Sequence, residues 1–189
     1  MESSSILKVI RIVYDQVARP RLELKPWGLL IILPQGYNEK YAYQLIKKHE
    51  KWIKEKYAIL SKALELAKKV EIVNRSLKEF KQTIKQLVNE YSKELGVKVN
   101  RIYIRDMNTK WASCSPKGNI SINKIAKFLP EDLLKYIIYH EMCHLLEKRH
   151  NTKFWSLIAK KLPNYQELEL KLLAYLIKLK YMNTFSNKN

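Results

Sequence analysis

Cysteine is scarce in this chain: Cys114 and Cys143 are the only two among 189 residues. Two thiols cannot form a disulfide framework or a Cys-only zinc site, so we expect two reduced side chains in or near the core. Glycine and proline are also rare, at four and six residues, which excludes collagen-like and low-complexity architectures. Because no uncharged apolar run approaches the roughly 18 to 20 residues of a membrane span and no secretory signal pattern is present, we expect a cytoplasmic protein without membrane association.

Acidic residues are outnumbered two to one: 18 Asp and Glu stand against 36 Lys and Arg, and the formal net charge is +18. Such an excess attracts polyanions in a salt-dependent way. Lysine exceeds arginine by 29 to 7, which favours point-charge contacts over readout of base edges. Two interpretations stay open: weak, non-specific binding of nucleic acid, or a solvated lysine-rich surface.

Hydrophobic periodicity divides the chain into strand-like and helix-like stretches. Strands are expected over 8–34, with a turn at 25–28, which together predict a small antiparallel meander. Helical spacing follows over about 38–66 and again over about 76–95. We expect residues 1–70 to form the N-terminal β-meander and long helix, packed with the following region into one compact unit overall.

The second expected domain covers residues 71–189 and again mixes strands with helices. Short strands are predicted at 97–104, 110–115 and 119–123, with hairpin chemistry at 115–118. After Pro130 three helices are predicted, over about 131–148, 151–161 and 164–181. The fold class is therefore α+β, with a small antiparallel sheet, N-terminal strands and long helices.

The segment His140-Glu141-Met142-Cys143-His144 contains the pattern His-Glu-x-x-His within a predicted helix. On an α-helix the two histidines lie one turn apart, so that both imidazoles can reach one zinc ion at about 2.0–2.1 Å. Glu141 lies about 100° around the helix from His140, close enough to take a proton from a metal-activated water without ligating the metal. The alternative is a chance pair of buried histidines. It is weakened because three of the four histidines fall within eleven residues.

A catalytic zinc ion commonly has three protein ligands, so a third is needed. Two residues are candidates. Glu147 lies seven positions after His140 on the same face, but a full turn beyond the pair. His150 precedes Asn151-Thr152, which predicts a helix break and a new N-cap, and a chain reversal there can bring its ring back. We favour His150 over Glu147.

These motifs together resemble the YgjP-like metallopeptidases, relatives of the SprT-like and WLM proteases among the zincins. The matching stretches are Lys110-Trp111-Ala112-Ser113-Cys114-Ser115, the His-Glu-x-x-His helix, His150-Asn151-Thr152-Lys153-Phe154-Trp155 and Pro163-Asn164-Tyr165. The resemblance implies a zincin-like metallopeptidase domain, one zinc ion held by His140, His144 and His150, and Glu141 as general base. The family usually has glycine where this chain has Ala112.

Three further residues are candidates for substrate contacts. Trp111 and Ser113 lie on a predicted strand that can form the sheet edge along which an extended peptide adds, or simply a core strand. Tyr165 is a candidate donor to a developing oxyanion, although a tyrosine near a helix start is more often structural.

Two functions from different classes follow. The first is a zinc-dependent metallopeptidase that hydrolyses peptide bonds in a peptide or protein substrate through a metal-activated water, with Glu141 as general base. The second is a basic nucleic-acid-binding protein with a structural or vestigial metal site. A protease recruited to nucleoprotein would combine them. Glu141 argues against a purely structural site, because structural zinc needs ligands and no base.

Overall fold

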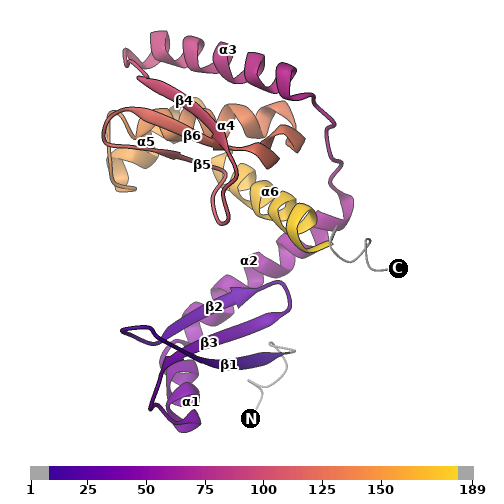
Figure 1. The fold of residues 1–189 in the computed structure, drawn as a ribbon, viewed down its shortest axis with the longest axis vertical. Helices are drawn as coiled ribbons and strands as arrows, with labels where there is room; N and C mark the ends of the chain where they lie inside the picture. The colour runs from indigo at the N-terminus through magenta and orange to yellow at the C-terminus, as the bar shows by residue number, and fades with distance from the viewer. Residues whose placement is uncertain (1–8, 183–189) are drawn as a thin grey trace. The chain divides into compact units, whose positions relative to one another are not determined.

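The computed structural model describes residues 9–182, which fall into two compact units (Figure 1). One unit comprises the described residues up to Lys68 together with those from Leu176 onward, and the other comprises Lys69–Tyr175. Each unit has its own hydrophobic cluster. Within the described range, no helix is both long and apolar enough to cross a membrane. The predicted domain division at residue 70 stays a prediction.

The N-terminal unit contains a three-stranded sheet in the order β1-β3-β2. Its elements are β1 (Ile10–Asp15), β2 (Arg21–Lys25), β3 (Gly28–Pro34), α1 (Glu39–Lys48) and α2 (Glu50–Lys69). β2 and β3 form the predicted hairpin, but β1 pairs with β3 in parallel, so the expected antiparallel meander is wrong. β3 takes the central position because it is the apolar run: Leu29, Ile31 and Leu33 are fully buried, whereas β1 is largely exposed.

The single helix predicted over 38–66 is also wrong, because two helices occupy that stretch. His49 ends α1, and its backbone N–H donates to the carbonyls of Leu45 and Ile46 at 3.0 and 3.2 Å. Continuous helical periodicity in the sequence does not reveal this break, because apolar residues on both sides of His49 keep a helix-like spacing.

The second unit is also built around a three-stranded sheet, in the order β4-β6-β5, with helices packed against it. Its elements are α3 (Leu77–Leu95), β4 (Arg101–Arg105), β5 (Ala112–Cys114), β6 (Asn119–Asn123), a 3₁₀ turn (Lys124–Phe128), α4 (Glu131–Cys143), α5 (Thr152–Lys161) and most of α6 (Tyr165–Ile177), which a π-helical turn (Lys178–Met182) follows. The α+β class is confirmed.

The sheet of this unit is mixed, so the expectation of an antiparallel sheet is wrong for one of its two pairings. β5 and β6 form the predicted hairpin, closed by the Gly118 N–H donating to the Ser115 carbonyl at 2.9 Å. Gly118 has φ +74°, a conformation that a side chain would strain. β4 pairs with β6 in parallel, and this leaves β4 and β5 at opposite edges.

Local capping explains where the helices of this unit begin and end. Ser76 and Glu79 form a capping box at the start of α3, and Gly96 ends the helix in the left-handed conformation, which confirms the predicted helix. α4 ends at Cys143, so the prediction that this helix continues to residue 148 is wrong. After Cys143 the backbone forms tight turns, with the N–H of Leu145 donating to Met142 and that of Leu146 to Cys143.

Candidate metal centre

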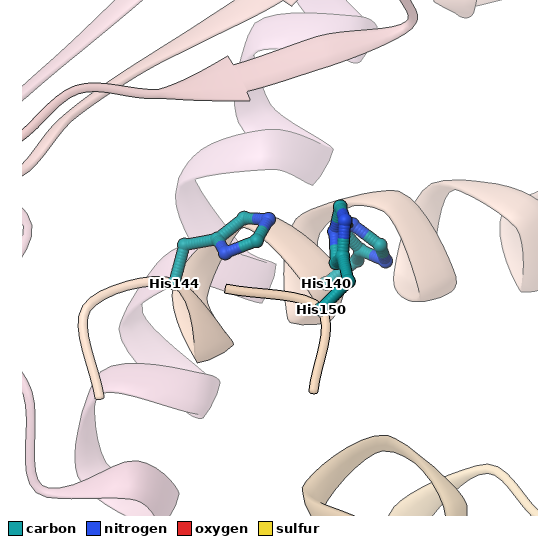
Figure 2. Close-up of side chains that lie close together, drawn as sticks. All are labelled: His140, His144 and His150. Carbon is teal, nitrogen blue, oxygen red and sulfur yellow. The ribbon is translucent and has the colours of Figure 1, made fainter. Parts of the chain in front are cut away.

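Three histidines come together where α4 ends and α5 begins (Figure 2). His140 lies in the last turn of α4, and His144 is the residue that caps its C-terminus. The Nε2 atoms of His140 and His150 lie 3.0 Å apart, and one ring nitrogen of each of the three residues lies within 4.8 Å of the others. Nitrogens bound to one zinc at about 2.0–2.1 Å in tetrahedral geometry are roughly 3.3 Å apart, so this cluster has the scale of a single-ion site.

The chain reversal that carries His150 follows from the turn between the two helices. Asn151 caps α5, because its side-chain oxygen accepts from the Phe154 N–H at 3.0 Å, as the sequence predicts. The ring of His150 is thereby returned to the end of α4. Glu147 has a different place: its carboxylate accepts from the Arg149 N–H at 3.3 Å, and its backbone carbonyl lies 3.2 Å from Nδ1 of His144. A carbonyl on Nδ1 leaves Nε2 of His144 as the free ligand atom.

Phe154 is a supporting residue that sequence reasoning did not assign to the site. Its side chain is fully buried, and its ring centroid lies 4.9, 4.6 and 4.7 Å from those of His140, His144 and His150. The ring stacks on His144 at 26° and meets the other two at steep angles. The signal available in the sequence was its spacing, three residues after a predicted N-cap and four after His150.

Burial, together with the neighbouring histidines, keeps His140 and His144 neutral. Burial lowers the pKa of His140 to about 3, with further lowering by His144 and His150. The pKa of His144 is lowered mainly by burial, although its hydrogen bond to Glu147 opposes the shift. Metal ions bind the neutral imidazole, so these shifts favour ligation. Nδ1 of His140 is buried without a hydrogen-bond partner among the described residues. The donor set therefore fits a nitrogen-ligated ion such as zinc.

Glu141 lies on α4 between the two helical histidines and is only 8% exposed. Burial raises its pKa to about 7, while a hydrogen bond from the backbone of Cys114 and the positive charge of Lys110 oppose that rise. A carboxyl group with a pKa near neutrality can both accept and return a proton at physiological pH. A bound cation would add its own charge and favour the carboxylate form.

β5 connects the site to the sheet edge on which substrate contacts were predicted. Among the strands of residues 9–182 it pairs only with β6, so it is an edge strand there. Trp111 precedes it, and its carbonyl accepts from the Asn123 N–H at 2.8 Å, while Ser113 lies opposite Ser121. Tyr165 stacks on Trp155 at 5.1 Å, and Trp155 in turn stacks on His150 at 5.5 Å. Tyr165 is thus connected to His150 through Trp155, whereas Trp111 and Ser113 lie beside and on the edge strand β5.

Asn123 is a second supporting residue that the sequence did not reveal. It is 1% exposed, and its side-chain amide donates to the carbonyls of Met107 and Lys110 at 2.7 and 2.8 Å. These bonds hold the loop that carries Lys110, whose charge acts on Glu141 and His144. A cleft of about 260 Å³ lies beside His144, lined by Cys114, Ser115, Pro116, His144, Leu145 and Lys148.

Comparison with known proteins supports the resemblance stated above. Residues 56–175, more than half of the chain, match the family model described as "YgjP-like, metallopeptidase domain". A UTP pyrophosphatase of Escherichia coli (strain K12) is 35% identical over 63 residues, covering 33% of this chain and 38% of that protein. An uncharacterized protein of Methanocaldococcus jannaschii is 36% identical over 112 residues, covering 53% of this chain and 98% of that protein.

Two solved structures of metallopeptidase zymogens are also similar. Abylysin of Pyrococcus abyssi has 25% identity and a TM-score of 0.46, covering 49% of this chain and 94% of that chain. Jannalysin of Methanocaldococcus jannaschii has 35% identity and a TM-score of 0.46, covering 50% of this chain and 97% of that chain. The family match by itself confirms the resemblance and the prediction of a metallopeptidase domain.

Proposed function

Because the chain belongs to the YgjP-like metallopeptidase family, we propose that it is a zinc-dependent metallopeptidase that hydrolyses peptide bonds. The observation that carries the proposal is the convergence of three imidazoles within 4.8 Å of one another, next to a buried carboxyl group. A structural site would need the ligands but not the base. Family membership implies a metal ion; zinc, and a single ion, are our assignment from the all-nitrogen donor set.

In this proposal His140, His144 and His150 hold one zinc ion. When bound, zinc supplies a Lewis acid that polarises the scissile carbonyl and makes water acidic enough to lose a proton near neutral pH. Glu141 accepts that proton and then delivers it to the leaving amine. The Cys114 backbone and Lys110 favour the charged form that must act first.

The proposed substrate is an extended peptide that lies along the free edge of β5. An edge strand presents unpaired N–H and C=O groups, with which a peptide can pair. Trp111 and Ser113 flank that edge and would contact the substrate. Tyr165 is the proposed hydrogen-bond donor to the oxyanion, provided that its hydroxyl turns toward the reacting carbonyl.

A Glu141→Gln variant tests the mechanism, with Glu147→Gln as its matched control on the same segment. Both proteins are purified, their zinc content is measured, and hydrolysis of an unfolded protein substrate is followed. We expect Glu141→Gln to retain zinc and lose at least about a hundredfold in activity, as expected for a general base. We expect Glu147→Gln to stay near the parent. Equal activity of the parent and Glu141→Gln would remove this residue from the mechanism.

The ligand assignment has a separate test. His140→Ala and His144→Ala should abolish stoichiometric zinc binding, and His150→Ala should weaken it strongly, because a site with two ligands holds zinc poorly. If His150→Ala binds zinc like the parent while Glu147→Ala does not, the third ligand is Glu147 and the site is a two-histidine, one-carboxylate centre.

A second candidate function is nucleotide pyrophosphohydrolysis, favoured by the 35% identity to a UTP pyrophosphatase. The chain matches only 38% of that protein's length, so we rank this candidate below peptide hydrolysis. Lys148 in the cleft beside His144 is a cation that can pair with phosphate. Phosphate release from UTP, coupled to a pyrophosphatase and measured on the same parent and Glu141→Gln preparations, separates the two activities. UTP turnover without peptide hydrolysis would reverse our ranking.

Nucleic-acid binding and cytoplasmic location stay predictions. Weak, non-specific binding is expected to fall steeply with salt, with a slope of about −0.9 per phosphate contact on duplex DNA. A salt titration with a random-sequence duplex measures it.

A further inference from the structure

A second hollow in the metallopeptidase unit lies between α3 and the edge strand β4, a pair that Figure 1 shows side by side. It has a volume of about 780 Å³, within the range of ligand sites, and is the larger of the two clefts described here. The helix contributes Lys81, Ile84, Lys85, Val88, Asn89 and Ser92, and residues 97–104 supply the other wall. We call it the α3–β4 groove.

The α3–β4 groove has the two parts that strand addition needs. Within residues 9–182, β4 pairs only with β6, so its outer edge has no strand partner. The lining is mostly apolar, with Ile84 and Val88 from the helix and Val97, Val99 and Ile104 from the other wall. A free strand edge beside a helix, with an apolar floor between them, is the arrangement in which peptide-binding domains take up an extended ligand.

The charge of the α3–β4 groove has one sign. Lys81, Lys85, Lys98 and Arg101 line it, and no carboxylate does. None of these four cations takes part in an ion pair among the described residues, although seven other lysines do. Lys81 and Lys85 are one helical turn apart, so they project along the same face of α3. An acidic ligand would gain four partners here without displacing any existing pair.

The α3–β4 groove is separate from the metal centre. No residue that lines it belongs to the histidine cluster or to the cleft beside His144. β4 and β5 are the opposite edges of one sheet, and the proposed catalytic substrate lies along β5. A ligand on β4 would therefore leave the β5 edge open.

The lining favours a peptide over a nucleic acid. Single-stranded nucleic acids bind to series of aromatic side chains on which successive bases stack, and Tyr103 is the only aromatic residue in this lining. An apolar floor and a free row of backbone groups instead suit a peptide, whose side chains alternate between two faces. We propose that the α3–β4 groove binds an extended peptide segment in which acidic and apolar side chains alternate, and that this segment adds to the sheet as a fourth strand beside β4.

The proposal does not depend on the peptidase reaction, so a direct binding experiment with the full chain tests it. The probe is a fluorescein-labelled peptide of about ten residues that alternates Glu and Val, measured by fluorescence anisotropy at 0.15 M salt. Two comparison peptides are used: one alternates Lys and Val, and the other is the Glu-Val sequence with an N-methyl group on every residue. We expect the Glu-Val peptide to bind and both comparison peptides to bind at least tenfold more weakly, because one has the wrong charge and the other has no backbone N–H with which to pair along either edge. Equal binding of the N-methylated peptide would overturn strand addition.

Charge reversal on α3 locates the site. We expect the double variant Lys81→Glu/Lys85→Glu to weaken binding at least tenfold. The control Lys78→Glu/Lys93→Glu makes the same change in net charge on the same helix, outside the lining, and should leave affinity within about twofold. All four lysines are exposed, and melting temperatures verify that both variants fold. Equal losses in the two variants would reduce the effect to general charge attraction. A random single-stranded oligonucleotide is added as a competitor of the peptide. If it displaces the peptide, and if its own binding is abolished in Lys81→Glu/Lys85→Glu but not in the control variant, the groove binds nucleic acid and the peptide proposal is wrong.

Discussion

Phe154 provides the sharpest test of how the metal centre is held together. Its ring contacts the rings of all three histidines and is fully buried, yet it carries no ligand atom. We predict that Phe154→Leu weakens zinc binding although every proposed ligand and Glu141 remain. Leucine cannot offer the flat surface on which His144 stacks at 26°, so that ring gains rotational freedom.

The expected magnitudes follow from burial and from the loss of ring contacts. Phe→Leu removes three carbons, and at roughly 0.8 kcal/mol for each buried carbon plus a cavity contribution the cost is about 2–3 kcal/mol of unfolding free energy. For a domain of about 100 residues this lowers the melting temperature by roughly 8–12 °C. Residues that orient metal ligands change metal affinity by about 10- to 100-fold, and we expect Phe154→Leu to fall in this range.

The matched control is Phe80→Leu. Phe80 lies on α3, is equally buried and belongs to the same hydrophobic cluster, but makes no ring contact with the histidines among the described interactions. Zinc affinity is measured by competition with a chromophoric chelator, at a temperature where both variants are folded. Thermal unfolding of the metal-free proteins should show similar losses of stability, whereas only Phe154→Leu should lose zinc affinity.

Two results would refute this reasoning. Phe154→Leu that binds zinc as tightly as the parent would show that the ligands are held by their own helix and turn alone. Phe80→Leu that loses as much zinc affinity as Phe154→Leu would show that the effect is general destabilisation and not orientation of the rings.

Further predictions concern pH and the loop beside the site. In the metal-free protein the pKa of His140 in the folded state, about 3, is below its value in the unfolded state. The stabilisation that His140 contributes to the unfolding free energy is therefore fully present above about pH 6.5 and is lost as the pH falls toward 3. The pKa of Glu141 in the folded state, about 7, is above its value in the unfolded state. The stabilisation that Glu141 contributes to the unfolding free energy is therefore fully present below about pH 4.5 and is lost as the pH rises through 7. The two trends oppose each other between about pH 4.5 and 6.5. We therefore expect the unfolding free energy of Glu141→Gln, measured by urea denaturation, to rise more steeply with pH in that window than that of the parent. The same dependence on pH in both proteins would contradict this. Asn123→Ala leaves the carbonyls of Met107 and Lys110 without their donor and should cost about 2–4 kcal/mol of unfolding free energy in urea denaturation, whereas exposed Asn74→Ala should cost far less. Similar losses would contradict the role of Asn123 in the loop.

Local interactions explain why several features could be predicted from the sequence. The helix over 76–95 depends on a capping box and a terminal glycine, which are contacts between residues a few positions apart. The hairpin at 115–118 likewise depends on its own turn residues. The candidate ligands His140 and His144 lie one turn apart on a predicted helix, so their proximity follows from helix geometry.

Other features depended on contacts between distant segments, which no local pattern records. The parallel pairing of β1 with β3 and of β4 with β6 is decided by which strand takes the buried centre of each sheet. The end of α4 at Cys143 matters for the site. The turn that follows brings His150 back to the end of the helix and puts the Glu147 carbonyl within hydrogen-bond distance of Nδ1 of His144. The chemical groups of the site are local in the sequence, because three imidazoles and the two carboxyl groups of Glu141 and Glu147 lie within eleven residues. The environment of these groups depends on the tertiary structure: burial keeps the imidazoles of His140 and His144 neutral and raises the pKa of Glu141, because desolvation disfavours the charged form of each group.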